Sequence, residues 1–314
     1  MTTEFSLAVH GGAGTLRPDA MSAARAKLYH AGLRRALEAG RAILAADGSA
    51  LDAVTAAVVA LEDDPLFNAG RGAVFTAAGT QEMDAAVMEG RERRAGAVAG
   101  ICGPQNPVLA ARAVMEHSPH VLVVGDGALA LCRAAGLAFA DRDYFYTPAR
   151  WRALQQVLAR QAEGIGEDDE ARRHGTVGAV ARDRHGDLAA ATSTGGTTGK
   201  LPGRIGDTPL IGAGTFADNA SCAVSATGHG EFFIRFAAAH EIAARVLHRG
   251  QSLDAAARSV IDELGREGGS GGVVAVGRDG DVALPFNCSG MYRGYVKTDG
   301  IVYTAIYDEA YRSA

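Results

Sequence analysis

The chain has 314 residues, of which 47% are hydrophobic and 21% charged, which is enough apolar material for a large core and excludes global disorder. Its 36 acidic and 31 basic residues provide no broad cationic surface, so we expect no nucleic-acid partner. No apolar run approaches the ~20 residues that a membrane-spanning helix needs, and residues 1–9 lack a basic region, so we expect a cytoplasmic protein with no membrane partner.

The first elements are a short strand and two helices. A strand at residues 7–9 leads into the glycine-rich loop 10–14, and apolar residues at helical spacing follow from Ala24 to Leu37. Ser49 is the expected N-cap of a second helix, with Asp52 three positions further on, and Pro65 should end that helix.

The later elements alternate less regularly between helix and strand. We predict helices at residues 107–115 and 231–248, and strands at residues 121–124, 176–181, 188–193, 223–227, 273–277 and 282–284. The strands around residues 182–187 are separated by a short glycine-containing segment, which is typical of an antiparallel hairpin. The sheet should therefore be antiparallel or mixed.

A charged segment precedes the strand that begins at Thr176. Residues 161–174 contain hardly any apolar residue, which predicts an exposed, mobile linker. Taken alone, Thr176 is an ordinary β-branched strand residue.

Three further segments are open to more than one interpretation. Residues 195–200 resemble a phosphate-binding loop, but Thr194 and Leu201 stand where that motif requires Gly and Ser or Thr. The Thr227-Gly228-His229-Gly230 segment, between a strand and a helix, could bind a developing oxyanion or a phosphate. Arg204 and Asp207 could form a surface ion pair or could bind the carboxylate and ammonium of an amino acid.

The cysteines are Cys102, Cys132, Cys222 and Cys288. Their scattered positions indicate neither a zinc site nor a disulfide framework, so we expect reduced thiols. A cysteine nucleophile paired with a distant histidine remains an open alternative.

Taken together, these segments resemble the plant-type L-asparaginases and isoaspartyl peptidases, which are threonine-type N-terminal nucleophile (Ntn) hydrolases. The resemblance covers nearly the whole chain, in residues 10–14, 64–70, 175–180, 191–196, 201–207, 226–231 and 268–272. It implies an α+β fold, a four-layer αββα sandwich with mostly antiparallel sheets. It also implies that residues 1–314 form one domain, cut into an α subunit (1–175, with a flexible linker at about 158–175) and a β subunit (176–314).

The resemblance implies a role for each matching residue. Thr176 becomes the nucleophile and, through its freed amine with a reference pKa of about 7.7 to 8, the base. The other roles implied are orientation of the nucleophile by Thr194, an oxyanion site at Thr227 and Gly228, substrate binding by Arg204, Asp207, Thr227, Gly228 and Gly230, and self-cleavage by Gly175 and Thr176 with help from Gly11.

The implied activity is hydrolysis of L-asparagine and β-aspartyl dipeptides without a catalytic cofactor, in a dimer of αβ heterodimers. A structural sodium ion is expected on the backbone carbonyls of Leu61, Glu62, Asp64, Phe67, Ala69 and Arg71. Thr197 and Gly199 depart from the family pattern, so the leaving-group side should be more open. A glycosylasparaginase-like hydrolase and an uncut, non-catalytic relative are the alternatives.

Overall fold

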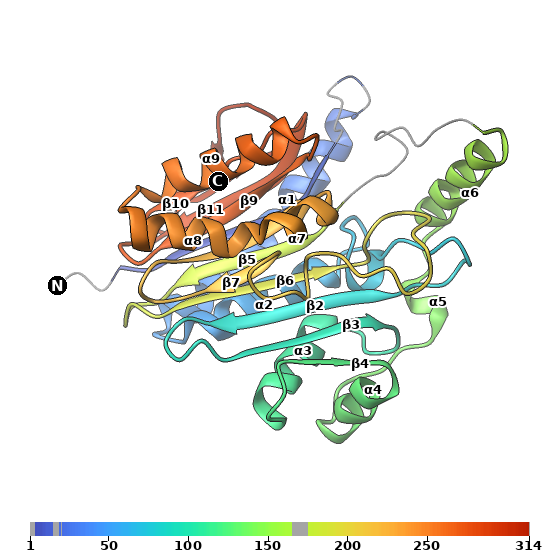
Figure 1. The fold of residues 1–314 in the computed structure, drawn as a ribbon, viewed down its shortest axis with the longest axis horizontal. Coiled ribbons are helices and arrows are strands. Elements are labelled where there is room, and N and C mark those ends of the chain that lie inside the picture. Colours follow the sequence, from blue (N-terminus) through green and yellow to red (C-terminus); the bar gives the residue numbers. More distant parts are fainter. Residues whose placement is uncertain (1–3, 15–18, 20, 165–174, 314) are drawn as a thin grey trace.

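The computed structural model describes residues 4–14, 19, 21–164 and 175–313, and their strands form two sheets (Figure 1). The larger sheet has the order β13-β12-β11-β1-β5-β6-β2-β3-β4. Its ladders are antiparallel except for the parallel pair β3–β4. The strands are β1 (Ser6–Gly14), β2 (Met83–Glu89), β3 (Ala95–Ile101), β4 (Leu122–Val124), β5 (Val177–Arg182), β6 (Leu188–Thr194), β11 (Gly290–Lys297), β12 (Val302–Ala305) and β13 (Arg312–Ser313).

The smaller sheet is antiparallel and has the order β10-β9-β8-β7. Its strands are β7 (Thr215–Ala217), β8 (Cys222–Gly228), β9 (Gly271–Gly277) and β10 (Val282–Ala283). It contacts the centre of the larger sheet, where β8 and β9 meet β1 and β5.

Helices pack on both sheets. The helices α1 (Ala23–Ala45), α2 (Ala50–Glu62) and α3 (Pro107–His117) contact the larger sheet, whereas α8 (Ala238–Arg249) and α9 (Leu253–Arg266) contact the smaller one (Figure 1). Further helices in the described part are α4 (Gly125–Ala134), α5 (Arg142–Phe145), α6 (Pro148–Ala162), α7 (Gly230–Phe236) and the 3₁₀ turn η2 (Gly70–Gly72). The prediction of an α+β protein is confirmed.

Side-chain alternation along β5 divides the core in two. Ala179 and Ala181 join the apolar cluster under α1 and α2, and Val180 joins the cluster between the two sheets. Because successive residues of a strand point to opposite faces, a strand buried on both sides must be apolar or small at every position. The small side chains around Thr176 therefore reflect burial on both faces.

Most predicted elements are observed with small shifts of their ends. Ser49 caps α2 as expected, because its hydroxyl accepts a hydrogen bond from the Asp52 amide at 3.1 Å. The helix ends at Glu62, shortly before Pro65. Some observed elements have no counterpart among the predicted ones. They are strands β2, β3, β7, β11, β12 and β13 and helices α4, α5, α6 and α9.

Two predictions are wrong in part. The helix expected at residues 231–248 is broken at Ala237, which lies in the left-handed region with φ 46° and ψ 47°. The amides of Ala239 and His240 donate to the carbonyls of Ala213 and Gly212 in the loop before β7. The first amides of α8 are therefore bound by that loop, and α8 is a separate helix from α7. The flexible linker expected at about 158–175 is wrong for its first residues, because α6 continues to Ala162; residues 165–174 lie outside the described part.

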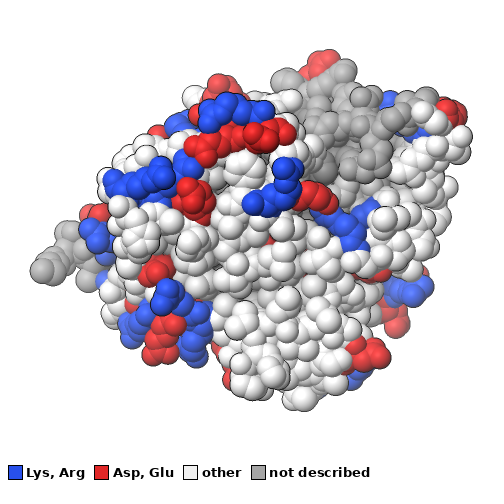
Figure 2. Space-filling model, viewed as in Figure 1, with Lys and Arg blue, Asp and Glu red and all other residues white. Residues whose placement is uncertain are grey.

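The described residues include no helix with the length and apolar character to cross a membrane. On the face that Figure 2 shows, acidic and basic side chains lie next to one another. Ion pairs such as that of Arg258 with Asp254, at 2.8 Å on α9, account for this mixture.

The left-handed Ala237 predicts a stabilising substitution. The Ala237→Gly variant should unfold with a free energy about 1 kcal/mol higher, because Gly adopts this conformation without the Cβ clash. Thermal and denaturant unfolding would measure the change. The Ala130→Gly variant, in the middle of α4 where the backbone is helical, should instead lower the free energy of unfolding by about 1 kcal/mol. Equal losses of stability in both variants would contradict backbone strain at Ala237.

Candidate active site

The Gly175–Thr176 peptide bond is buried at the start of β5. The Thr176 side chain is 6% exposed, and its hydroxyl donates to Oγ1 of Thr194 at 3.1 Å. The hairpin between β5 and β6 pairs Val177 with Ser193, so Thr194 lies beside Thr176 across the ladder. The predicted nucleophile and its predicted orienting residue are therefore in contact.

The Thr194 hydroxyl makes three hydrogen bonds. It donates to the carbonyl oxygen of Gly175 at 3.1 Å and accepts from the Gly196 amide at 2.9 Å and from Thr176. A hydroxyl has one hydrogen and two lone pairs, so all its capacity is used and the direction of each bond is determined. Thr194 thus accepts a hydrogen bond from the Thr176 hydroxyl and polarises the neighbouring carbonyl.

Asn68 also binds the Gly175 carbonyl. Its amide Nδ2 donates to the carbonyl oxygens of Gly175 and Gly196, each at 2.6 Å, and its Oδ1 accepts from the Val74 amide at 2.9 Å. No spacing rule could place Asn68 here, because 107 residues separate it from Gly175.

The prediction of a glycine-rich loop at residues 10–14 is wrong, because these residues are the last part of β1 and pair with β11. This part of β1 approaches the Gly175–Thr176 bond through Gly12. A Cβ on Gly12, whose φ is +113°, would lie 2.9 Å from Cα of Gly175, whereas one on Gly11 would lie 2.3 Å from the Phe67 ring. Gly175 lies against the Asn68 side chain. A Cβ there would be 3.1 Å from Cβ of Asn68, so close approach explains the glycine.

The Thr227–Gly228 pair ends β8 in a tight crossing with β9. Gly228 has a φ of +142°, and a Cβ on it would lie 2.3 Å from the carbonyl oxygen of Ser270. The Thr227 hydroxyl accepts from the Ala13 amide at 3.2 Å and keeps its own hydrogen to donate. Gly230 begins α7 where a Cβ would lie 2.8 Å from Oδ1 of Asp207.

Arg204 and Asp207 both reach the pocket but are not paired with each other. Nε and Nη2 of Arg204 donate to Oε1 of Glu231 at 2.9 and 2.8 Å, a partner that sequence reasoning missed. Asp207 is 4% exposed, and its Oδ2 has no hydrogen-bond partner within the described residues. Burial raises the pKa of the Asp207 carboxyl to about 7, because the ionised carboxylate is poorly solvated there. A cationic ligand beside Asp207 would stabilise the ionised carboxylate, so the site suits such a ligand.

These residues line one small pocket. Its walls are Gly175, Thr176, Thr194, Gly196, Thr197, Arg204, Gly206, Asp207 and Gly228. Its free volume of about 10 Å³ is roughly the room that one water molecule needs. With Gly175 in place, the pocket is too small for an amino acid.

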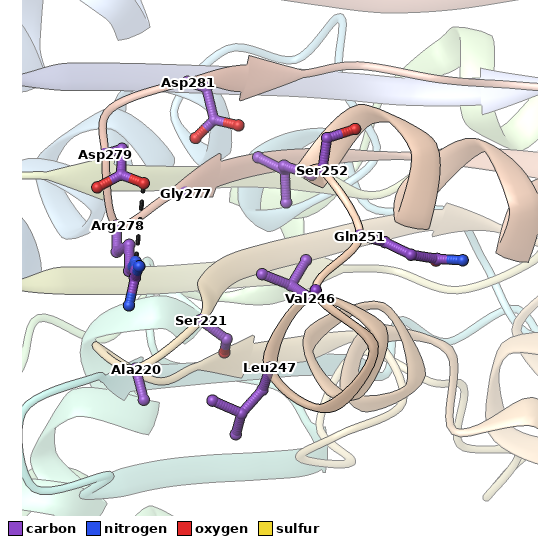
Figure 3. Close-up of a pocket in the computed structure, with 12 residues that line it drawn as sticks. Ala220, Ser221, Val246, Leu247, Gln251, Ser252, Gly277, Arg278, Asp279 and Asp281 are labelled. Carbon is purple, nitrogen blue, oxygen red and sulfur yellow. Dashed lines mark ion pairs between the residues drawn. The ribbon is translucent and has the colours of Figure 1, made fainter.

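A larger hollow of about 470 Å³ lies elsewhere, beside the turn between α8 and α9 (Figure 3). The polar residues around it include Ser221, Gln251 and the Arg278–Asp279 ion pair, whose charged atoms are 3.7 Å apart. None of the predicted site residues lines it. Size alone therefore does not identify the reactive pocket.

The cysteine alternative receives no support from the thiols. Burial raises the pKa of Cys222 to about 12 and also raises the pKa values of Cys102 and Cys132. A thiol is nucleophilic as the thiolate, which these sites disfavour.

The buried Asp207 predicts a pH-dependent stability. Its folded pKa of about 7 exceeds the unfolded value of about 3.9, so unfolding releases its proton between these values. The free energy of unfolding of the wild type should therefore fall as the pH rises from about 4 to 7, whereas Asp207→Asn should lack this contribution.

Melting temperatures at pH 4.5, 6 and 7.5 would measure the contribution of Asp207 to stability, with the exposed Asp262→Asn variant on α9 as control. The melting temperature of Asp207→Asn minus that of the wild type should increase as the pH rises over this range. A gap that does not change with pH would contradict a protonated, buried Asp207.

Similarity to known proteins covers nearly the whole chain. A family model described as asparaginase matches residues 3–306. The chain is 52% identical to the isoaspartyl peptidase of Salmonella typhimurium, over 96% of this chain and 98% of that protein. It is 50% identical to the isoaspartyl peptidase of Escherichia coli over 96% of both chains, and 40% identical to the isoaspartyl peptidase/L-asparaginase of Mus musculus over 92% and 87%. The chain belongs to the asparaginase family.

Proposed function

We propose that this protein is a self-cleaving amidohydrolase that releases L-aspartate from β-aspartyl dipeptides and from L-asparagine. The observation that carries the proposal is the hydroxyl of Thr176, hydrogen-bonded to Thr194 and adjacent to a carbonyl that Thr194 and Asn68 polarise. The names of the relatives supply the substrate class.

Self-cleavage begins with attack of Oγ1 of Thr176 on the carbonyl carbon of Gly175. The C–N bond breaks as the C–O bond forms, and the hydroxyl proton passes to the departing nitrogen. Asn68 and Thr194 stabilise the negative charge that develops on the Gly175 oxygen. Water then hydrolyses the ester, which leaves Thr176 with a free amine and residues 1–175 and 176–314 as separate chains.

The freed amine makes Thr176 competent as both nucleophile and base. With a reference pKa of about 7.7 to 8, it accepts the hydroxyl proton at neutral pH and later gives it to the leaving amine. The Thr227 hydroxyl and the Gly228 amide would stabilise the oxyanion, a contact worth about 3 to 4 kcal/mol of the barrier. An uncut chain has an amide nitrogen at Thr176, so it lacks this base.

The two charged residues orient the substrate. Arg204 binds the α-carboxylate, and the buried Asp207 binds the α-ammonium, whose positive charge stabilises the ionised carboxyl. The β-carbonyl then faces Thr176. Departure of Gly175 from the pocket would supply the room that the uncut chain lacks.

The residues of the 61–72 loop fit a structural sodium ion. A Cβ on Gly70 or Gly72 would lie 2.6 Å from the carbonyl oxygen of Glu62 or 2.0 Å from that of Phe67, so the loop folds tightly around its carbonyls. Oxygen donors suit a hard cation. The ion would support the loop that carries Asn68, through the carbonyls of Leu61, Glu62, Asp64, Phe67, Ala69 and Arg71.

The larger architecture is part of the same proposal. We infer that the two sheets and their outer helices form the four-layer αββα sandwich of Ntn hydrolases, and that two cut molecules associate as a dimer of αβ heterodimers. The contacts of β1 and β5 with β8 and β9, and of α2 and α9 with the outer faces, support the layering.

The alternatives find less support. Lys200, which a phosphate-binding loop would direct to a nucleotide, is 5% exposed and its Nζ donates to the carbonyl of Glu82 at 2.7 Å. A glycosylasparaginase-like activity shares the mechanism and differs only in accepting a glycan on the leaving amide.

Intact masses of fresh and aged protein under denaturing conditions test the proposal. The wild type should yield two fragments, one beginning at Thr176, and should then hydrolyse β-aspartyl dipeptides. The Thr176→Ala variant should remain one chain, while Thr55→Ala on α2 should be cut normally. A wild type that keeps its full mass would contradict self-cleavage and would favour a non-catalytic relative.

Asn68 should control the rate of the cut. Removal of one oxyanion donor typically costs a factor of about 10² to 10³, so Asn68→Ala should slow fragment appearance by that factor. The measurement is the fragment fraction against time. Cleavage by Asn68→Ala at the wild-type rate would exclude Asn68 from the oxyanion site of the self-cleavage step.

A further inference from the structure

His10, on β1 beside the proposed cleavage site, contacts the backbone of Thr176. Its side chain is fully buried, with Nδ1 2.9 Å from the carbonyl oxygen of Thr176 and Nε2 2.8 Å from Oγ of Ser225. The chain continues from Ser225 to Thr192 at 2.8 Å and from Thr192 to Thr215 at 2.7 Å. The proposed mechanism assigns no role to these four side chains.

The acceptor at one end determines the protons of His10, Ser225 and Thr192. A carbonyl oxygen only accepts, so Nδ1 of His10 must carry the hydrogen and Nε2 must accept from Ser225. Ser225 has then used its hydrogen, so Thr192 must donate to it. The single hydrogen of the Thr215 hydroxyl is shared between Thr192 and the carbonyl oxygen of Thr208, 3.0 Å away. The donors from Thr192 to His10 therefore all point toward the Thr176 carbonyl.

The register of the strands builds this arrangement around Gly178. His10 on β1 and Thr192 on β6 both pair with Gly178 on β5, from opposite sides. Ser225 enters from β8 of the other sheet, where a Cβ on Gly178 would lie only 2.0 Å from its hydroxyl oxygen. The missing side chain at Gly178 therefore lets the two sheets join through hydrogen bonds.

The imidazole acts as a neutral group. Burial lowers the pKa of His10 to about 3, although its bond to the Thr176 carbonyl opposes that shift. No change of charge at His10 is expected at the pH values where an N-terminal amine works as a base. Its contribution must come from hydrogen-bond geometry.

We propose that His10 is a positioning residue, which clamps the main-chain carbonyl of Thr176 and thereby keeps the nucleophile at the Thr194 hydroxyl. This inference rests on the proposed function. The pairing of β1 with β5 ends at His10–Gly178, two residues short of Thr176. After the cut Thr176 is a chain end, and chain ends are poorly ordered unless they are tied down.

Paired substitutions test the clamp. In His10→Asn the side-chain amide can donate from the place of Nδ1, whereas in His10→Gln it reaches the place of Nε2 and not the Thr176 carbonyl. We expect His10→Gln to lower kcat for a β-aspartyl dipeptide by about 10- to 100-fold with KM within about twofold, because small misplacement of reacting groups has effects of this size. His10→Asn should stay within about threefold of the wild-type kcat.

His30→Gln is the matched control. His30 is 2% exposed, and its Nδ1 lies 2.9 Å from Oγ1 of Thr304, so this variant also removes a buried contact made through Nδ1. It should lower the melting temperature without lowering kcat. A His10→Gln chain that stays uncut while His10→Asn is cut would also support the clamp. Equal loss of kcat in both His10 variants, or a loss of kcat in His10→Gln that only follows a loss of melting temperature of the size seen in His30→Gln, would overturn it.

Nitrogen NMR of histidine-labelled protein separates this proposal from the proposed function. His10 should show a protonated Nδ1 and a bare Nε2 that do not titrate between pH 5 and 9. A wild type that neither cuts itself nor hydrolyses substrate would contradict the proposed function, and the spectrum would still test the clamp. A proton on Nε2 would overturn the clamp even in an active enzyme.

Discussion

The saturated hydroxyl of Thr194 is the interaction on which the rest of the site depends. Its single hydrogen is committed to the Gly175 carbonyl, so it meets Thr176 only as an acceptor. This direction increases the nucleophilic character of the Thr176 oxygen and the electrophilic character of the neighbouring carbonyl carbon. Both effects require the residues at the end of β6 to face the start of β5, which the hairpin between these strands ensures.

Close approach of backbone segments is the second constraint. Gly12 touches Gly175, Gly228 crosses Gly271, and Gly178 makes room for a hydroxyl from the other sheet. In each place a methyl group would occupy the position of another atom. The site is therefore built by bringing main chains together, and few large side chains shape it.

The local parts of this structure could be predicted from sequence. The change from a charged segment to an apolar strand near Thr176, the cap at Ser49 and the hairpin before β6 all arise from neighbouring residues. The break at Ala237 could not be predicted, because it follows from hydrogen bonds to the 212–213 loop.

Distant contacts within the site were equally inaccessible. Asn68 contacts the carbonyl of Gly175, 107 residues away in the sequence, and His10 contacts the carbonyl of Thr176, 166 residues away. Neither hydrophobic periodicity nor motif spacing predicts contacts over such distances. Resemblance to the asparaginase family indicated Thr176, Thr194, Arg204, Asp207 and Gly228, which the structure gathers around one pocket. It did not indicate that Glu231 holds one edge of Arg204.

The strand order has a consequence for the two fragments that the proposed self-cleavage would produce. In the larger sheet β1 lies between β11 and β5, and β2 lies beside β6, so strands from before and after residue 175 alternate. Two fragments interleaved in this way cannot separate without dismantling the centre of the sheet. The uncut chain folds as a single molecule, whereas fragments once unfolded must find each other again, so recovery of the cut protein from denaturant would depend on its concentration.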